Sequence, residues 1–227
     1  MKELIHYRAT IFVESPIGFT KDNVGIFPLQ DWKCMPLPDN ANSRVIDPFE
    51  DVAFTEERYG DMQWKAKNPE KGMAIIFLGQ KIDIVGLPFA EEQVFLSACM
   101  DCFRAICDTY EVGKILRFAY CPTYGEKKGN FDAVLKVDSF KGVAPENVSL
   151  RNVFRVKENV NGKNVTINYL MLISSGFYNE NGTILPSVIY DVDINSLPEE
   201  KLSFVMEDVD SFLKSVSLWA KDFVNKY

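Results

Sequence analysis

The chain has 227 residues, of which 47% are hydrophobic and 25% are charged. This composition is that of an ordinary globular protein and excludes a fibrous repeat or general disorder. The formal net charge is −7, which argues against nucleic acid as a partner, because duplex binding requires a basic face that displaces counterions. The length suits a single domain, which we expect to cover residues 1–227.

The sequence favours a cytoplasmic protein without a membrane partner. Its longest apolar run, residues 73–78, is far shorter than the roughly 20 residues that a membrane-spanning helix needs. Charged residues interrupt positions 1–8, unlike the apolar core of a secretory signal. The cysteines number five, and an odd count without an export signal is most simply explained by reduced thiols.

The N-terminal part combines one regular strand with a long irregular segment. Alternation over residues 3–14 predicts a strand that carries Leu4, His6 and Arg8 on its polar side. Residues 15–72 are rich in proline, which blocks regular structure, and in aromatic side chains, which favour burial. We expect this segment to pack over the core, with a short strand near 61–67. The alternative is a lid or a partner-binding surface.

Two strands and a helix follow. Residues 73–78 and 81–85 have strand character, and a helix is expected over about 88–110, because Pro88 suits a first helical turn. Apolar residues at helical spacing form one stripe on it: Val94, Phe95, Ala98, Cys99, Cys102, Ile106 and Tyr110.

The C-terminal part is predicted to contain a run of strands and a closing helix. The strands are expected at 114–121, 131–137, 152–160, 165–174 and 183–194. Asn161-Gly162 is a strong two-residue hairpin signal. The pattern Ser196-Leu197-Pro198-Glu199 resembles a capping box and predicts a helix from 198 to about 225. Its expected apolar stripe includes Leu202, Val205, Phe212, Leu213 and Trp219.

The two parts resemble each other in sequence. Ile82-Asp83-Ile84 corresponds to Val192-Asp193-Ile194, and Leu87-Pro88 corresponds to Leu197-Pro198. We therefore predict an internal duplication with pseudo-two-fold symmetry, in which residues 1–112 and 113–227 are structural halves that share one core. The predicted fold class is α+β: a large antiparallel sheet covered on one face by two long helices.

Three groups of residues are candidates for chemistry, and each has a plainer structural explanation. Cys99, Cys102 and Cys107 lie on one predicted helix surface, where three thiols cannot surround a metal, so we expect buried thiols and no metal. Asp83, Asp191 and Asp193 could hold a cation or act as acids and bases, but we expect a solvated sheet face. His6 has no nucleophile at a readable distance.

Five residues are candidates for binding. The loop around Tyr124, Lys127 and Lys128 contains glycines and lysines without the spacing of a phosphate-binding loop, and exposed loops often bind partners. Trp32 and Trp64 belong to the aromatic segment and could anchor an interface.

The strand Leu116-Arg117-Phe118-Ala119-Tyr120 resembles the Leu-Arg-Tyr-Ile-Asn strand of a sporadically distributed family of uncharacterised bacterial proteins. Leucine and arginine match, Phe118 replaces the tyrosine, and the asparagine is absent. The order of predicted elements is also similar to that of the family. The resemblance implies a bacterial cytosolic protein, and it implies no catalytic residues and no cofactor.

We expect a non-enzymatic interaction or regulatory module that binds another macromolecule, with a protein as the partner. The first alternative is a small-molecule-binding protein, because a helix over a curved sheet can enclose an apolar cavity. The second is a metal-assisted hydrolase that uses Asp83, Asp191 and Asp193.

Overall fold

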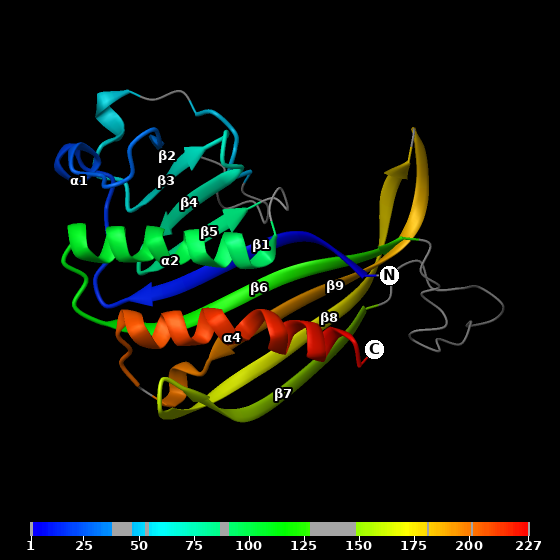
Figure 1. The fold of residues 1–227 in the computed structure, drawn as a ribbon. Helices are drawn as coiled ribbons and strands as arrows, with labels where there is room; N and C mark the ends of the chain where they lie inside the picture. Colours follow the sequence, from blue (N-terminus) through cyan, green and yellow to red (C-terminus); the bar gives the residue numbers. More distant parts are fainter. Residues whose placement is uncertain are drawn as a thin grey trace.

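The structure is a computed structural model of the chain, and it describes residues 2–37, 47–52, 55–86, 91–127, 149–180, 182–200 and 202–226. The fold is α+β, as predicted from the sequence. A nine-stranded antiparallel sheet forms one layer, and helices form the other (Figure 1).

The strands are β1 (Lys2–Val13), β2 (Lys33–Pro36), β3 (Gln63–Asn68), β4 (Met73–Leu78), β5 (Lys81–Gly86), β6 (Ile115–Lys127), β7 (Ser149–Val160), β8 (Lys163–Glu180) and β9 (Thr183–Ser196). The helices are α1 (Lys21–Gly25), α2 (Glu92–Thr109) and α4 (Met206–Val224), with short 3-10 turns at Glu56–Arg58 and Pro198–Glu200. The strand predicted at 131–137 and the residue Lys128 lie outside the described residues.

The sheet has the order β2-β3-β4-β5-β1-β6-β9-β8-β7, so its middle strand is β1, which forms a pair with β6. Arg8 lies opposite Cys121 in this pair, although the two strands are far apart in the sequence. A bulge between Leu4 and His6 shifts the alternation: Leu4 packs against the core and Ile5 is exposed. The sequence had suggested the opposite sides for these two residues.

Both long helices cover the same face of the sheet, which we call the inner face (Figure 1). Their apolar residues join the inner-face residues of the strands in one core cluster, which includes Phe95 and Phe103 of α2 and Phe212 and Leu213 of α4. The helices also contact each other directly: Gln93 Nε2 donates to Ser217 Oγ at 2.5 Å. The predicted arrangement of two helices over one sheet face is therefore confirmed.

The closing helix begins later than the sequence predicts. Ser196 is the last residue of β9, and its hydroxyl accepts a hydrogen bond of 3.2 Å from Phe118 N–H instead of capping a helix. The chain then forms a bridge between Phe204 and Ile115 before α4 starts at Met206. Leu202 and Val205, which were expected in the apolar stripe, are consequently exposed. The capping-box prediction was wrong because the Ser196 hydroxyl is hydrogen-bonded to the neighbouring strand β6.

Helix α2 begins at Glu92, and the predicted Leu87-Pro88 start lies outside the described residues. Cys99, Cys102 and Cys107 are buried on its inner side, as expected, and Val94 is exposed against expectation. All five cysteines of the chain are free thiols. Among the described residues, no helix has the length and apolarity to cross a lipid bilayer.

The aromatic residues described in segment 15–72 pack over the sheet. Trp64 is fully buried on β3, stacks on Phe77 with ring centroids 3.9 Å apart, and donates from Nε1 to the Ile17 carbonyl. Phe49 lies on the other face, which we call the outer face, against a small cluster that includes Ile76. This part of the chain therefore covers both faces of the strands β3 to β5.

Apart from the edge strand β2, the same number of strands lies on each side of the pair β1 and β6. From β1 outward come β5, β4 and β3, and from β6 outward come β9, β8 and β7, with α2 and α4 following β5 and β9 in the chain. This arrangement agrees with two paired halves, but it does not confirm a duplication. The strands of the two halves differ in length, and Leu197-Pro198 does not start a long helix.

Candidate interaction surface

Strand β7 forms one edge of the sheet and is paired on one side only among the described residues. It pairs with β8 over its whole length, from Ser149 opposite Ser174 to Val160 opposite Lys163. The strand at the other edge, β2, has only four residues and ends in Pro36. Short edge strands with proline are protected against pairing with other chains, whereas a long regular edge is not.

The local sequence explains why β7 is regular. The turn that joins it to β8 has positive φ angles at Asn161 (51°) and Gly162 (79°), which the primed hairpin turns require. The segment that precedes the turn contains Val153, Phe154 and Val156, which are residue types favoured in strands. The predicted hairpin is thus confirmed.

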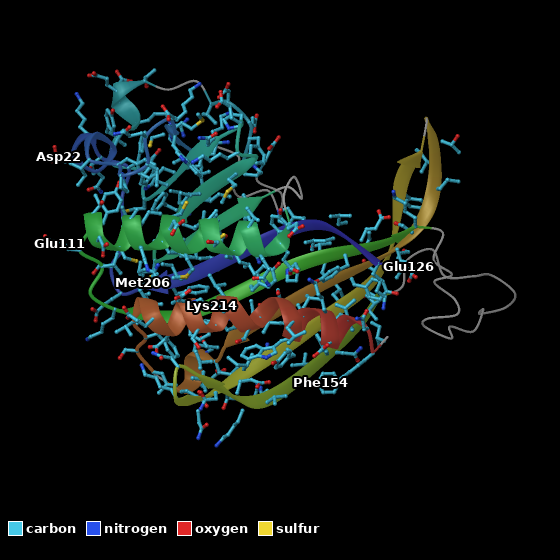
Figure 2. The ribbon with its side chains drawn as sticks, in the orientation of Figure 1. Asp22, Glu111, Glu126, Phe154, Met206 and Lys214 are labelled. Atoms are coloured by element: carbon cyan, nitrogen blue, oxygen red, sulfur yellow. The ribbon has the colours of Figure 1, made fainter. Side chains whose placement is uncertain are left out.

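The inner-face side of β7 is apolar and partly exposed. Phe154 lies opposite Tyr169 of the core, and its side chain is 48% exposed, while Leu150 and Val156 are 38% and 43% exposed. Figure 2 shows Phe154 beside the C-terminal part of α4. Its ring meets that of Phe223 edge-on at 5.8 Å between centroids. These side chains extend beyond the area that α4 covers.

A pocket of about 330 Å³ lies between this strand and the end of α4. The residues that line it are Phe154, Val156, Glu158, Tyr169, Trp219, Asp222, Phe223 and Lys226. The Tyr169 hydroxyl donates to Glu158 Oε1 at 2.7 Å, and burial together with this carboxylate raises the pKa of Tyr169. The pocket has aromatic walls, formed by Phe154, Tyr169, Trp219 and Phe223, which suit an apolar anchor residue of a partner.

The outer-face side of β7 is basic. Arg151, Arg155 and Lys157 lie on this side and are exposed, with the exposed Val153 between the two arginines, and no ion pair joins the three basic residues to the described residues. The chain as a whole carries a net charge of −7, so this row is a local reversal of charge. Sequence analysis missed the row, although alternating apolar and basic residues directly before Asn161-Gly162 were a readable signal.

A second exposed apolar region lies on the hairpin of β8 and β9, which projects beyond the rest of the sheet (Figure 1). Phe177 and Ile184 are 75% and 71% exposed there.

The aspartates considered for a hydrolase lie on the outer face and are bound by neighbouring donors. Asp83 is buried, not solvated as expected; it accepts from Thr10 Oγ1 at 2.6 Å and lies 2.6 Å from Lys81 Nζ. Asp191 accepts from Thr123 Oγ1 at 2.7 Å, and Asp193 accepts from Asn195 Nδ2 at 2.8 Å. Each carboxylate is therefore engaged by its own donor. Among the described residues no group of three or more potential ligands could hold a metal ion.

His6 lies in the same outer-face region. Burial lowers its pKa, the nearby Arg8 lowers it further, and Asp191 acts in the opposite direction. The imidazole is therefore held in its neutral form near pH 7.

The residues proposed for binding from the sequence do not gather in one place. Trp64 belongs to the core, and Trp32 is partly buried against it. Lys127 is exposed and lies 3.3 Å from Glu3. Tyr124 is not at an exposed loop tip: it lies within β6, and its side chain is only 5% exposed.

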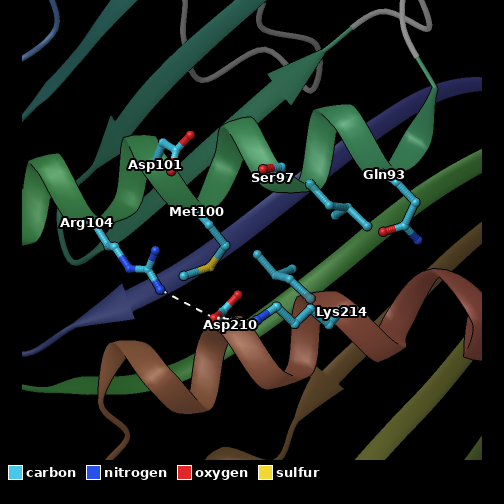
Figure 3. A pocket seen from close by; sticks show the side chains of 9 residues that line it. Gln93, Ser97, Met100, Asp101, Arg104, Asp210 and Lys214 are labelled. Carbon is cyan, nitrogen blue, oxygen red and sulfur yellow. Dashed lines mark hydrogen bonds and ion pairs between the residues drawn. The ribbon is translucent and has the colours of Figure 1, made fainter.

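A groove between α2 and α4, of about 340 Å³, is shown in Figure 3. Three of its charged residues pair with one another: Arg104 Nη2 and Lys214 Nζ lie 3.3 Å and 2.9 Å from Asp210 Oδ2. Both basic residues of the groove are thus already paired with a carboxylate of the chain.

Comparison with models of known protein families gives no match, and a search of curated proteins also finds none.

Proposed function

We propose that this protein is a non-enzymatic interaction module whose β7 edge receives an extended, acidic segment of a partner protein. The observation that carries the proposal is the combination of a twelve-residue strand, unpaired along one side among the described residues, with an apolar row and a basic row on its two faces. Strand addition supplies main-chain hydrogen bonds for affinity, and alternate side chains supply specificity.

The basic residues of β7 favour an acidic partner strand at this edge. A partner strand with acidic residues at every second position would place them beside Arg151, Arg155 and Lys157, and opposite charges across strands are favourable. Its intervening apolar residues would lie beside Phe154 and Val156. A second copy of the chain fits less well, because two antiparallel β7 strands would bring their basic rows to the same face.

The setting of this function is also a proposal. Free thiols support a reducing compartment such as the cytoplasm, and Leu116-Arg117 on β6 supports membership of the bacterial family with the Leu-Arg-Tyr-Ile-Asn strand.

The test uses fluorescein-labelled peptides of alternating glutamate and valine, with a lysine and valine peptide as the counterpart. Fluorescence anisotropy at low salt is expected to show binding of the acidic peptide only. The double variant Arg155→Glu/Lys157→Glu and the variant Phe154→Ala should each weaken it, while the control Lys21→Glu/Lys33→Glu, on exposed lysines elsewhere, should not.

Lack of binding up to about 1 mM, or equal binding of both peptides, would overturn the proposal. A dimer in sedimentation equilibrium that the Arg155→Glu/Lys157→Glu variant strengthens would replace the acidic partner with a second copy of the chain.

A further inference from the structure

We propose that a second pocket, between the N-terminus of α2 and the C-terminus of α4, binds a small organic monocarboxylate with an apolar body. The pocket has a volume of about 420 Å³ and is lined by Lys2, Leu4, Glu92, Tyr124, Lys221, Val224 and Asn225. It is independent of the β7 edge, and such a volume is typical of small-molecule sites.

Glu92 lines this site and interacts with two neighbouring side chains. It is the first residue of α2 and is 7% exposed. Its Oε1 accepts a hydrogen bond of 2.6 Å from the hydroxyl of the buried Tyr120, and its Oε2 lies 2.9 Å from Lys221 Nζ. Burial, and then the carboxylate of Glu92, raises the pKa of Tyr120, so this phenol remains a donor. The carboxylate therefore fixes Lys221 at the edge of the pocket.

Tyr124 provides the observation that points to a ligand. Its side chain is 5% exposed and lines the pocket, and its hydroxyl is buried without a hydrogen-bond partner among the described residues. Buried hydroxyl groups in proteins nearly always have a partner. Burial and the neighbouring Glu92 raise the pKa of Tyr124, so the group is a neutral phenol that can donate its proton to an incoming oxygen.

The ammonium groups of Lys2 and Lys221 provide further hydrogen-bond donors in the pocket. Lys2 Nζ donates to the Val224 carbonyl at 2.8 Å, and Lys221 Nζ is paired with Glu92. Since an ammonium group carries three protons, each lysine retains donors for a ligand. The N-terminus of α2, a helix of 18 residues, adds a partial positive charge.

The balance of charge decides the class of ligand. Lys2 and Lys221 against Glu92 leave one net positive charge in the lining, which a monocarboxylate neutralises and a phosphate dianion exceeds. Glu126 lies outside the lining and accepts a hydrogen bond of 3.1 Å from the Tyr190 hydroxyl. Its negative charge attracts the Lys2 ammonium group and would repel a dianion in the pocket. Leu4 and Val224 form an apolar wall, which suits an aliphatic or aromatic body on the acid.

The groove between α2 and α4 differs from this pocket in its charges and donors. There the lining carries two basic residues, Arg104 and Lys214, and two acidic residues, Asp101 and Asp210, so its formal charge is zero, and no buried side-chain donor of that groove lacks a partner among the described residues. At the Tyr124 pocket, by contrast, spare cationic donors line the same space as an unpartnered buried hydroxyl.

The test titrates the full chain with hexanoate and benzoate by isothermal calorimetry, with hexanol, hexylamine and inorganic phosphate as comparison probes. We expect the two carboxylates to bind with one site per chain, and the alcohol, the amine and phosphate to bind at least tenfold more weakly. Tyr124→Phe, which removes only the hydroxyl, should weaken hexanoate binding by about tenfold. Lys221→Met should also weaken it, whereas Lys214→Met, on the same helix but in the other groove, should leave it unchanged.

Thermal unfolding of Tyr124→Phe gives a second readout. If the hydroxyl is unpartnered without ligand, its removal should leave the ligand-free protein as stable or more stable, and hexanoate should raise the unfolding temperature of the wild type more than that of the variant. Loss of stability without ligand would mean that the chain itself satisfies the hydroxyl, and the proposal would fail. It would also fail if hexanoate did not bind, or if phosphate bound more tightly.

Discussion

Lys163, the first residue of β8, places its Nζ 2.6 Å from Oδ2 of Asp208, which is fully buried in the first turn of α4. The same carboxylate accepts from Val205 N–H at 2.9 Å and from Asn161 Nδ2 at 3.0 Å. One side chain therefore caps the closing helix and attaches it to the turn between β7 and β8.

We predict that Asp208→Asn destabilises the protein by about 1.5–3 kcal/mol at pH 7, the usual range for hydrogen bonds to a charged group. Urea unfolding measures the change, and Asp222→Asn on the exposed side of α4 is the control, expected within about 0.5 kcal/mol of the wild type. Equal effects of the two substitutions would show that the buried carboxylate contributes nothing special.

The contribution of Asp208 should depend on pH. Burial alone would raise its pKa, but the hydrogen bonds from Lys163, Val205 and Asn161 outweigh this and hold the pKa below its usual value. The stabilisation is then complete above the unfolded-state pKa of about 3.9 and is lost as the pH falls through the lower folded-state value. The difference in unfolding free energy between wild type and Asp208→Asn should therefore shrink as the pH falls below the unfolded-state pKa of about 3.9. A difference that stayed constant between pH 7 and the acid range would contradict the assignment.

The core position of α4 gives another prediction. Leu213 is 2% exposed within the core cluster, so Leu213→Ala should cost about 2–5 kcal/mol of unfolding free energy. Lys214, the next residue, is 73% exposed and paired with Asp210 on the surface, and Lys214→Ala should cost about 1 kcal/mol or less. Similar denaturation midpoints for the two variants would show that the inner side of α4 is misassigned.

The cysteines should be unreactive in the native protein. Burial raises the pKa of Cys102 and Cys107 to about 11 and that of Cys34 and Cys121 to about 12, and it raises the pKa of Cys99 as well. Because the thiolate is the reactive form, reaction with a disulfide reagent at pH 8 should be slow until denaturant is added. Fast native reaction, a disulfide in fresh protein, or zinc bound in equal amount to the chain would each contradict this prediction.

The two tryptophans of segment 15–72 should differ in their importance. Trp64 is fully buried and stacked on Phe77, so Trp64→Ala should cost about 3–5 kcal/mol. Trp32 is only partly buried, and Trp32→Ala should cost clearly less. Chemical denaturation of both variants measures the difference, and a larger loss at Trp32 would reverse the packing described for this segment.

Local patterns in the sequence predicted the structure correctly where the conformation depends only on residues adjacent in the chain. Asn161-Gly162 forms its hairpin because the two positive φ angles depend only on these residues. The helix start predicted at Ser196 was wrong because the Ser196 hydroxyl accepts a hydrogen bond from Phe118 N–H of β6, a strand distant in sequence. Long-range pairing therefore overrode a correct local pattern.

The candidate surfaces were less predictable for the same reason. That β7 lies at an edge follows from the order of all the strands, which no segment of the sequence encodes by itself. Tyr124 was chosen as part of a loop, but β6 continues to Lys127 because β1 and β9 pair with it on both sides. The Tyr124 side chain is consequently buried against the core and does not form part of an exposed loop.

The pairing of β1 with β6 also has a consequence for how the chain folds during synthesis. Arg8 meets Cys121 only after about half of the chain has left the ribosome, and closing such a long loop is entropically costly. Until then β1 can pair with β5, but its other edge has no native neighbour. We therefore expect slow folding, since the sheet depends on contacts between distant residues, and an early intermediate that chaperones can recognise by this open strand.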